Sequence, residues 1–300
     1  MLSPVATAVR TIDIIAAPFA YGANDPGCAA GPQALRRAGI VEHIAGFGAA
    51  PAWREIELPP FEDRVAGALA AGTAVADAVE RSVRAGHRFL VLGGDHSIAA
   101  GTWAGASRAL RPRGELGLIW IDAHLDAHVP ETSPTGNLHG MPLAALLGAG
   151  LPEFARLAGR VPALDPRRLV IIGARSFEVQ EAAFLARQGV RIYGMAEVAS
   201  NGLRDVLSEA IAIVSSGTAG FGISLDVDAL DPREAPGVGT PVAGGIDSLD
   251  LMSALLGVAD LPGYRGIEIA EYNPLRDGGN RTAPLVAELA LAALATGVRK

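Results

Sequence analysis

The fold of this chain is organised around the segment LGLIWIDAHLDAH, residues 116–128. Its first half, residues 116–121, is apolar, as expected for a buried strand. Asp122, His124 and Asp126 then occupy alternate positions, and alternation is the side-chain period of an extended chain, so the three side chains point the same way as the strand ends. Burying two carboxylates and an imidazole on one side is unfavourable unless a positive charge lies between them. The segment therefore predicts half of a metal site.

Similar apolar runs recur along the chain, separated by Ala-rich segments of helical period. We predict strands at residues 11–17, 88–92, 117–121, 169–173, 190–193, 221–225 and 266–269. We predict helices at residues 32–38, 62–85, 98–110, 141–147, 177–187, 203–214, 249–258 and 282–295. Because continuously apolar strands are buried on both faces, this alternation indicates a three-layer α/β/α sandwich with a mostly parallel central sheet. The absence of a linker favours one domain, residues 1–300.

Composition excludes several classes of function. The net charge is −7 and no basic run occurs, which argues against nucleic acid and anionic membranes as partners and favours a small molecule. Lys300 is the only lysine, so Schiff-base and P-loop lysine chemistry are excluded. Cys28 is the only cysteine, which excludes internal disulfides and fits a passive role in a reducing compartment. No apolar run approaches the ~18–20 residues of a membrane-spanning helix, and we predict a cytoplasmic protein.

Polar residues collect directly after five of the predicted strands. These clusters are residues 93–97, 122–128, 173–176, 226–231 and 271–274. They lie at the carboxyl ends of the strands, the edge at which open α/β sheets bind ligands. Asp226 and Asp228 form a second alternating pair, while Asp231 precedes a proline and is interpreted as a turn residue.

The two segments together supply four carboxylates, from Asp122, Asp126, Asp226 and Asp228. This is too much negative charge for one divalent ion and suits two ions that share bridging oxygens. His96 and His124 provide one imidazole for each ion. Oxygen-rich ligation without sulfur favours Mn²⁺ over Zn²⁺ or Cu²⁺. Two such ions about 3.5–4 Å apart can deprotonate a bridging water, which indicates hydrolysis of a polarised carbon or phosphorus centre.

Five motifs give the chain a specific resemblance. They are GGDHS at 93–97, DAHLD at 122–126, SLDVDALDP at 224–232, GVGTP at 237–241 and EYNP at 271–274. In this order, and over most of the chain, they resemble the ureohydrolase family, the arginase and agmatinase group. ETSPTGNLHGMP at 131–142 is similar to the arginase branch in particular. The resemblance implies an arginase-like fold and an enzyme that assembles as a trimer or hexamer.

The resemblance also implies a ligand set. One manganese ion would lie between His96, Asp122, Asp126 and Asp226, and a second between His124, Asp122, Asp226 and Asp228. Asp122 and Asp226 would bridge the two ions. The implied reaction is attack of hydroxide on a guanidinium carbon, followed by collapse to urea and an amine. Asp126 would also accept a hydrogen bond from the nucleophile.

Two further residues take catalytic roles in the resemblance. Glu271 would pair with the planar guanidinium group, although a carboxylate at the start of a helix is the alternative interpretation. His139, on a loop beside Gly140, would shuttle a proton to the leaving amine. A substrate-positioning or merely exposed histidine is the alternative for His139.

At the far end of the expected substrate site, several residues differ from the family's usual pattern. His128 stands where the family usually has asparagine, Thr135 where it has serine and Glu178 where it has aspartate. Asn137 matches and can donate to a carboxylate. His128 either binds a carboxylate when protonated or is a plain loop residue. These polar groups favour L-arginine as the substrate. The alternatives are agmatine, which lacks a carboxylate, and guanidino acids other than arginine.

Two rival hypotheses belong to other classes. Deacetylases of related α/β architecture use a single zinc, and a family member can also serve as a non-catalytic binding subunit. The paired Asp226 and Asp228, with the complete Asp122, His124 and Asp126 set, favour two ions and an active enzyme. Metal stoichiometry and urea release distinguish these hypotheses.

Overall fold

The computed structural model describes residues 10–58 and 60–297. Within them, one eight-stranded sheet runs in the order β2-β1-β3-β8-β7-β4-β5-β6, and each neighbouring pair is parallel. The strands are β1 Thr11–Ala17, β2 Ala50–Glu55, β3 Arg88–Gly93, β4 Glu115–Ile121, β5 Leu169–Ile172, β6 Arg191–Tyr193, β7 Thr218–Asp226 and β8 Tyr264–Ala270. None of the helices in these two ranges is long and apolar enough to cross a membrane.

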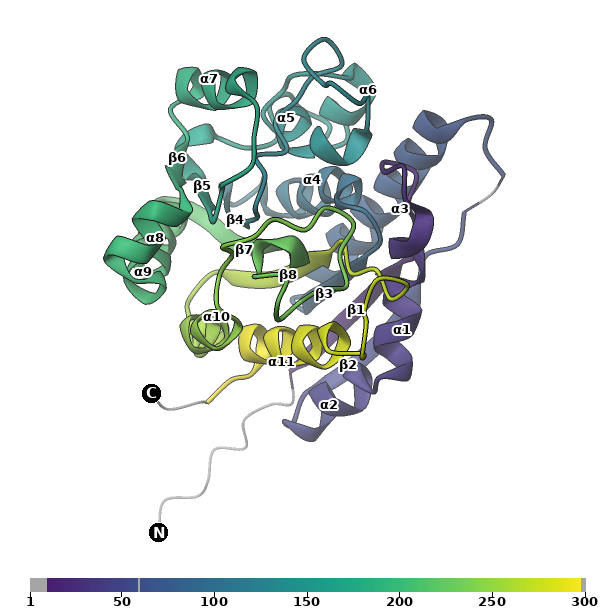
Figure 1. The fold of residues 1–300 in the computed structure, drawn as a ribbon, viewed down its shortest axis with the longest axis vertical. Coiled ribbons are helices and arrows are strands. Elements are labelled where there is room, and N and C mark those ends of the chain that lie inside the picture. The colour runs from purple at the N-terminus through teal and green to yellow at the C-terminus, as the bar shows by residue number, and fades with distance from the viewer. Residues whose placement is uncertain (1–9, 59, 298–300) are drawn as a thin grey trace.

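Helices lie on both sides of the sheet (Figure 1). The α-helices are α1 Gly31–Arg37, α2 Ile40–Gly46, α3 Arg64–Arg84, α4 Ala99–Leu110, α5 Pro142–Leu146, α6 Pro152–Ala155, α7 Val179–Gln188, α8 Met195–Asn201, α9 Leu203–Ser215, α10 Ser248–Leu255 and α11 Thr282–Leu294. Short 3-10 helices are η1 Pro26–Ala30, η2 His96–Ile98, η3 Leu138–Gly140, η4 Pro166–Arg168, η5 Val227–Ala229 and η6 Val258–Asp260.

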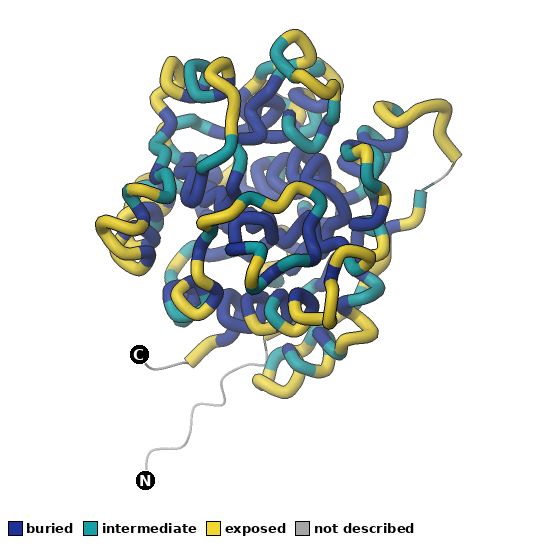
Figure 2. Tube along the Cα trace, viewed as in Figure 1, coloured by how far each residue is buried: buried dark blue, intermediate teal, exposed yellow. Residues whose placement is uncertain are grey.

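The alternation of strand side chains divides the interior into two cores. On β4, Ile119 and Ile121 pack into a core shared with α1, α2 and α8 to α11. Leu118 and Trp120 point to the opposite face and pack with α3, α4, α5 and α7. Strands such as β3, β4 and β5 therefore contribute to both layers. The predicted three-layer sandwich is confirmed, and Figure 2 shows its buried centre between exposed outer helices.

The predicted strands match seven of the eight observed strands closely, and β2, Ala50–Glu55, is the one that the sequence did not reveal. It lies at the edge of the sheet, pairs with β1 and has mostly exposed or half-buried side chains. An edge strand needs no continuous apolar run, so β2 lacks the signal that marked the others. The short helices α2, α6 and α8 were also missed.

The strand order places the functional segments together. The four neighbouring strands β3, β8, β7 and β4 lie in the middle of the sheet, and all four run in parallel. Their carboxyl ends therefore meet at one edge, with the clusters that begin at residues 93, 271, 226 and 122 side by side. The predicted convergence of these clusters on one crevice follows directly from this topology.

Candidate metal centre

The segment after β4 begins with a carboxylate held from both sides. The indole Nε1–H of Trp120 donates to Asp122 Oδ2 at 2.9 Å, and the backbone N–H of His124 donates to Asp122 Oδ1 at 2.7 Å. The chain is not extended through the whole segment, because Asp126 has a positive φ of 48°. The expected alternation therefore stops before Asp126, and the left-handed turn directs its carboxylate to the same site. Such strained backbone is concentrated at functional sites.

The second carboxylate pair follows β7 in a tight turn. Asp226 Oδ1 accepts the backbone N–H of Asp228 at 2.8 Å, so the two residues lie in a capped 3-10 turn, η5, rather than in an extended chain. Asp228 Oδ2 accepts the hydroxyl of Thr240 at 2.8 Å. Asp231 accepts the backbone N–H groups of Arg233 and Gly244, which confirms its interpretation as a turn residue.

His96 follows β3 through a turn that requires glycine. A Cβ on Gly94 would lie 1.8 Å from the carbonyl oxygen of Phe19, so only glycine fits there. The adjacent Asp95 is fully buried, and its side chain accepts the backbone N–H groups of Gly22 and Ser97. This turn carries His96 into the space above the strand ends.

The His96 ring faces three carboxylates. Its Nδ1 lies 3.0 Å from Asp126 Oδ2, 3.2 Å from Asp226 Oδ2 and 3.3 Å from Asp122 Oδ2. Although these oxygens are near, Nδ1 makes no hydrogen bond of acceptable geometry in the structure. A buried nitrogen that points into a group of carboxylate oxygens without a hydrogen bond fits a metal ligand.

The other histidine shares Asp122 with His96. His124 Nδ1 lies 3.2 Å from Asp228 Oδ2 and 3.5 Å from Asp122 Oδ1. The two oxygens of Asp122 thus face different histidines, which is the arrangement expected of a bridging carboxylate. Two groups of side chains that could each hold an ion result: His96, Asp122 and Asp226 in one, and Asp122, His124 and Asp228 in the other.

The crowded carboxylates force protons onto both histidines. Burial opposes a charge on His96, but the carboxylates beside Nδ1 raise its pKa well above the usual value. Burial also opposes a charge on His124, yet Asp122 and Asp228 raise its pKa to about 12. Both rings therefore act as counter-ions when no metal is bound.

The carboxylates respond to the same crowding. Burial and the charge of Asp122 raise the pKa of Asp126 to about 6. Burial together with Asp228 and Asp122 raises the pKa of Asp226 well above its usual value. Two divalent cations would supply the missing positive charge more effectively than two protonated rings. The donor set of imidazole nitrogen and carboxylate oxygen fits such ions.

Glu271 and His139 form a pair beside this centre. Glu271 has a positive φ of 66°, and its Oε1 lies 3.0 Å from His139 Nδ1 and accepts the backbone N–H of His96 at 2.9 Å. Burial works against both charges, but the pairing lowers the pKa of Glu271 and raises the pKa of His139 to about 9. Glu271 precedes no helix in the structure, so its alternative interpretation as a helix-start carboxylate is wrong.

A cavity of about 260 Å³ opens above the ligand cluster. Its walls include every residue that the sequence placed at the far end of the substrate site, together with His139: His128, Thr135, Asn137, Glu178 and His139. His124, Asp126, Asp226 and Asp228 also line it. The predicted substrate residues therefore share one cavity with four of the six predicted metal ligands.

His128 is held by specific contacts. Its Nε2 lies 2.9 Å from Glu178 Oε2 and 3.2 Å from Glu181 Oε2, and its Nδ1 lies 3.1 Å from Thr132 Oγ1. Glu181 is buried and accepts backbone N–H groups from Ala127 and Glu178. These contacts fix the position of His128 in its loop and leave its role toward a substrate as a prediction. The sequence analysis did not identify Glu181, although its spacing from Glu178 is that of a capping box.

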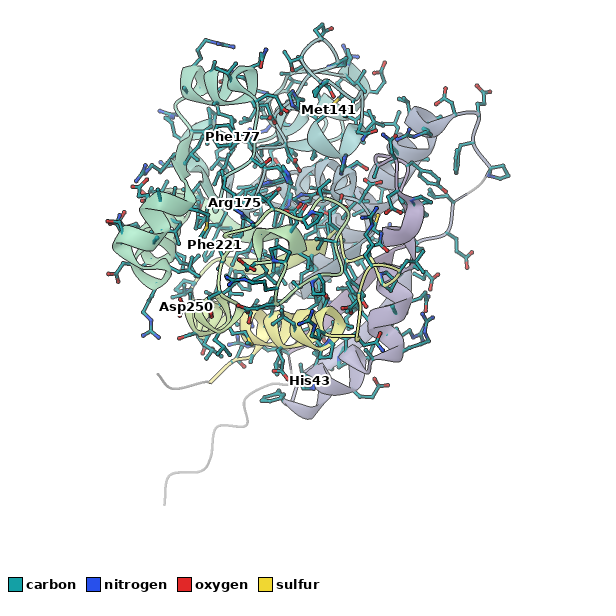
Figure 3. The ribbon with its side chains drawn as sticks, in the orientation of Figure 1. His43, Met141, Arg175, Phe177, Phe221 and Asp250 are labelled. Atoms are coloured by element: carbon teal, nitrogen blue, oxygen red, sulfur yellow. The ribbon has the colours of Figure 1, made fainter. Side chains whose placement is uncertain are left out.

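Other supporting residues also escaped the sequence analysis. Arg175, labelled in Figure 3, donates from Nη2 to the carbonyl oxygens of Asp228 and Val242, each at 2.8 Å, and so ties the turn after β7 to a distant loop. Trp120, Thr240 and Arg175 all support Asp122 or Asp228. Their roles depend on contacts between segments far apart in the chain, which no local pattern reveals.

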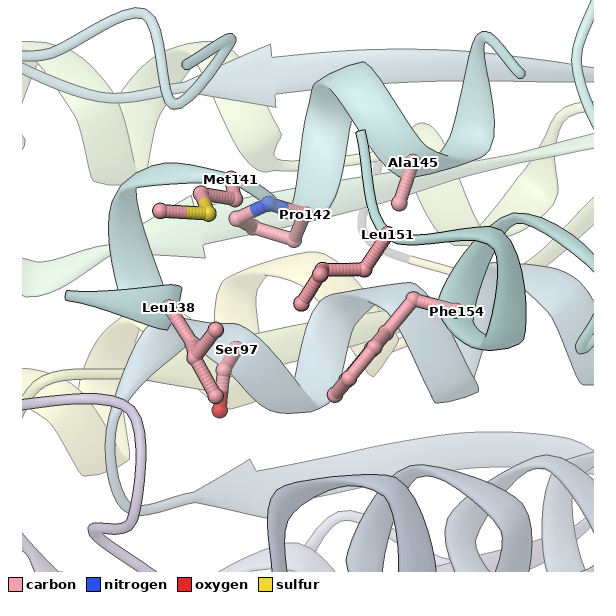
Figure 4. A pocket seen from close by; sticks show the side chains of 7 residues that line it. All are labelled: Ser97, Leu138, Met141, Pro142, Ala145, Leu151 and Phe154. Atoms are coloured by element: carbon pink, nitrogen blue, oxygen red, sulfur yellow. The ribbon is translucent and has the colours of Figure 1, made fainter. Parts of the chain in front are cut away.

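A smaller apolar hollow lies behind the His139 loop (Figure 4). It is lined by Ser97, Leu138, Met141, Pro142, Ala145, Leu151 and Phe154. Leu138 and Ser97 line it together, so the residue before His139 and the turn that carries His96 border the same hollow. The backbone N–H of His139 also donates to the carbonyl oxygen of Gly22 at 3.2 Å. Packing and backbone contacts thus fix this loop.

The fold and the site together define an α/β metallohydrolase with a centre suited to two ions. Residues 10–296 match the Arginase family, and the chain belongs to this family. The arginase of Bacillus caldovelox is 39% identical over 292 residues, covering 94% of this chain and 97% of the relative. The arginase of Bacillus subtilis (strain 168) is 38% identical over 288 residues, covering 93% of this chain and 96% of the relative. The predicted family is confirmed.

Solved structures agree with this assignment. The crystal structure of arginase from Bacillus subtilis superposes with a TM-score of 0.89 at 36% identity, covering 97% of this chain and 100% of that one. Proclavaminate amidino hydrolase from Streptomyces clavuligerus is more distant, with a TM-score of 0.75 at 25% identity, covering 95% of this chain and 91% of that one. The arginase-like fold is confirmed, and the chain is a ureohydrolase of the arginase type.

Proposed function

We propose that this enzyme hydrolyses L-arginine to L-ornithine and urea. The observation that carries the proposal is Asp122, whose two oxygens face His96 and His124 and so divide one carboxylate cluster into two ion sites. Full-length similarity to proteins named arginase supports the substrate. One large catalytic domain, residues 1–300, agrees with a sheet whose strands run from β1 to β8.

The proposed ions are two Mn²⁺ per chain, because six donors of imidazole and carboxylate type suit that ion. His96, Asp122, Asp126 and Asp226 would hold one ion, and His124, Asp122, Asp226 and Asp228 the other. When bound, the pair would supply a water of lowered pKa as the nucleophile. Asp126, with its pKa raised to about 6 by burial and by Asp122, can accept a hydrogen bond from that nucleophile.

Glu271 is proposed to orient the guanidinium group. It is buried, and its pKa is lowered by His139 despite the opposing effect of burial, so it carries a negative charge at neutral pH. A buried carboxylate binds a planar cation through charge-assisted hydrogen bonds.

His139 is proposed to protonate the leaving amine. Its pKa of about 9, raised by Glu271 against the effect of burial, keeps a proton on the ring at neutral pH. The proton shared between His139 Nδ1 and Glu271 Oε1 holds the ring in place over the cavity. A charged imidazole next to the departing nitrogen can act as a general acid.

The other end of the cavity is proposed to select the amino-acid part of the substrate. Asn137 and Thr135 can donate to an α-carboxylate, and Glu178 can pair with an α-ammonium group. A second candidate, hydrolysis of a guanidino acid without an α-amino group, is favoured by the contact between His128 Nε2 and Glu178 Oε2 at 2.9 Å. That contact occupies the carboxylate that would otherwise bind the α-ammonium group. Agmatine is a weaker candidate, since it leaves the hydroxyl and amide donors unused.

The test is a urea-release assay after loading with manganese. We expect L-arginine to be hydrolysed with the highest kcat/KM among L-arginine, agmatine, 4-guanidinobutyrate and 3-guanidinopropionate. Preference for 4-guanidinobutyrate would support the second candidate instead. Absence of urea from all four compounds, with two ions bound, would point to a non-catalytic family member. One tightly held zinc ion per chain would contradict the two-ion centre.

The resemblance to arginases also bears on the assembly of the chain and its location in the cell. We infer a homo-oligomer, a trimer or hexamer, located in the cytoplasm. Sedimentation velocity of the full chain tests the first, and a monomer at micromolar concentration would contradict it. Fractionation of the native cells tests the second.

A further inference from the structure

A buried series of polar contacts lies behind His96, on the side away from the carboxylate cluster. Ser224 on β7 and Glu268 on β8 are direct partners across the two strands. The hydroxyl of Ser224 donates to Glu268 Oε1 at 2.9 Å, and Ser224 Oγ lies 3.0 Å from His96 Nε2. Glu268 Oε1 itself lies 3.5 Å from His96 Nε2. Three segments of the chain therefore meet at the second nitrogen of the ring.

The carboxylate of Glu268 is unusual for a protein interior. Its side chain is fully buried, and Oε2 has no hydrogen-bond partner among the described residues. In the described part of the chain, His96 is the one basic side chain within ion-pair distance of the Glu268 carboxylate. A buried carboxylate with so few partners destabilises a fold, so its presence requires a functional reason.

The donors and acceptors in this series of contacts determine which nitrogen of the His96 ring carries the proton. Ser224 has one hydroxyl hydrogen, and Glu268 can only accept it when ionised, so Ser224 Oγ is left with lone pairs toward His96. His96 Nε2 must then be the donor, and when the ring is neutral its lone pair is on Nδ1. That nitrogen faces the carboxylate cluster and has no hydrogen-bond partner.

A second contact restricts the same ring. The indole of Trp120 stacks on His96, with 4.3 Å between ring centroids and an angle of 22° between the planes. Stacking prevents the imidazole from tilting, and the Ser224–Glu268 pair prevents it from rotating about its long axis. The ring is therefore held in both orientation and tautomer, as expected of a metal-binding histidine whose other nitrogen donates a hydrogen bond to a fixed acceptor.

We propose that Glu268, acting through Ser224, is a positioning residue that keeps Nδ1 of His96 free to bind one of the two ions. The inference rests on the proposed function, since it assumes the two-ion centre. It assigns a role to a residue that lies outside the cavity lining and outside the proposed set of ligands. Removal of the Glu268 carboxylate weakens one ion site and leaves the His124 site intact.

Manganese titration of the metal-free chain tests this role. We expect Glu268→Gln to bind one ion about 10–100-fold more weakly than the wild type, with the second unchanged. At intermediate manganese the variant then shows the electron paramagnetic resonance signal of an isolated ion, at one per chain, where the wild type shows a coupled pair. Glu268→Met, which removes the acceptor and keeps an apolar volume, should give the same loss.

Thermal unfolding without metal separates positioning from a structural role. Both Glu268 variants should unfold at or above the wild-type temperature, because each replaces a buried carboxylate, one of whose oxygens has no hydrogen bond, with a neutral side chain. Ser224→Ala should reproduce the loss of affinity. Ser107→Ala is the matched control, because Ser107 is also buried and its hydroxyl donates to the carbonyl oxygen of Ala163, away from the site. It should bind both ions normally.

Two results would overturn the inference, and they differ from each other. Lower unfolding temperatures with both ion affinities unchanged would mean that Glu268 is structural, and the two-ion centre would stand. Failure of the wild-type chain to bind a coupled pair of manganese ions would overturn the proposed function itself, and the role of Glu268 with it.

Discussion

At the scale of single residues, the site combines strained backbone with unbalanced charge. Asp126 and Glu271 both have positive φ angles, which are unfavourable for residues with a side chain. His96 and His124 carry raised pKa values because the neighbouring carboxylates outweigh the effect of burial. These local costs are tolerated because they place the donor atoms of the site around a common space.

His124 is the more accessible of the two histidines, with a side chain 26% exposed against 1% for His96. We expect His124→Ala to lose one manganese ion per chain and at least about 100-fold in kcat, because the nucleophile needs both ions. The fold should remain intact, since a partly exposed ring contributes little to the core. Metal analysis, urea release and circular dichroism check this. Unfolding of the variant at room temperature would show that the metal is structural.

His139 should make the stability of the metal-free chain depend on pH. Its pKa rises from the usual 6.5 to about 9 because Glu271 outweighs burial, so the folded state holds the proton more tightly than the unfolded state. The resulting stabilisation, on the order of 3 kcal/mol, is fully present below pH 6.5 and is lost as the pH rises through 9. In His139→Asn this loss should be absent. Urea denaturation of both chains at pH 6 and pH 10 measures the difference; parallel decreases would contradict the prediction.

At the scale of secondary-structure elements, the turns after the strands matter more than the strands themselves. The turn from β3 into η2 passes within contact of Phe19, where a Cβ on Gly94 would lie 1.8 Å from a carbonyl oxygen. The turn after β7 is closed by Asp226 and tied down by Arg175. The turns after β3 and β7 are therefore fixed by specific contacts, and the first of them requires glycine at position 94.

Substitution of one glycine tests this dependence on turn geometry. Gly94→Ala should lower the free energy of unfolding by about 2–4 kcal/mol, because the backbone must move to relieve the overlap with Phe19. It should also weaken manganese binding, since His96 is two residues further on. Gly46→Ala is the control: it lies in α2 with nothing within 4 Å of the added Cβ, and should be neutral or stabilising by up to about 1 kcal/mol. Equal stability of both variants would contradict the prediction.

At the scale of the whole molecule, metal binding, protonation and stability should be linked. His96 and His124 are protonated in the metal-free chain at neutral pH, since their pKa values are raised by the carboxylates. Manganese has to displace these protons, so binding should release protons and strengthen as the pH rises. Calorimetric titration in two buffers of different ionisation enthalpy measures the number released. A binding enthalpy independent of the buffer would contradict this linkage.

Removal of the ions should also lower the stability of the whole fold. The four central strands that carry the site belong to one sheet, so ions at their ends stabilise the folded state alone. The unfolding temperature should therefore rise steadily with manganese concentration above that of a chelator-treated sample. Magnesium should raise it less, because that ion favours all-oxygen sites. An unfolding temperature that does not change with manganese would contradict the prediction.

The sequence alone determined the layers of the fold and indicated the candidate metal ligands, together with His139 and Glu271. Buried parallel strands need continuous apolar runs, and turns at the ligand edge need particular polar residues, so both are visible as local patterns. The strand β2 was missed because an edge strand needs no such run. The resemblance to arginases rested on the same local motifs, around His96, Asp122, Asp226 and Glu271.

Only the tertiary structure decided how these residues work together. The strand order β3-β8-β7-β4 places four distant segments side by side, and no local pattern encodes that order. It sets Ser224 against Glu268 behind His96, and it directs the two oxygens of Asp122 to different histidines. It also pairs His128 with Glu178, at the end of the cavity that we propose selects the substrate. Except for the contact between Asp122 and His124, these contacts join residues tens of positions apart, and packing of the whole sheet is what brings such residues together.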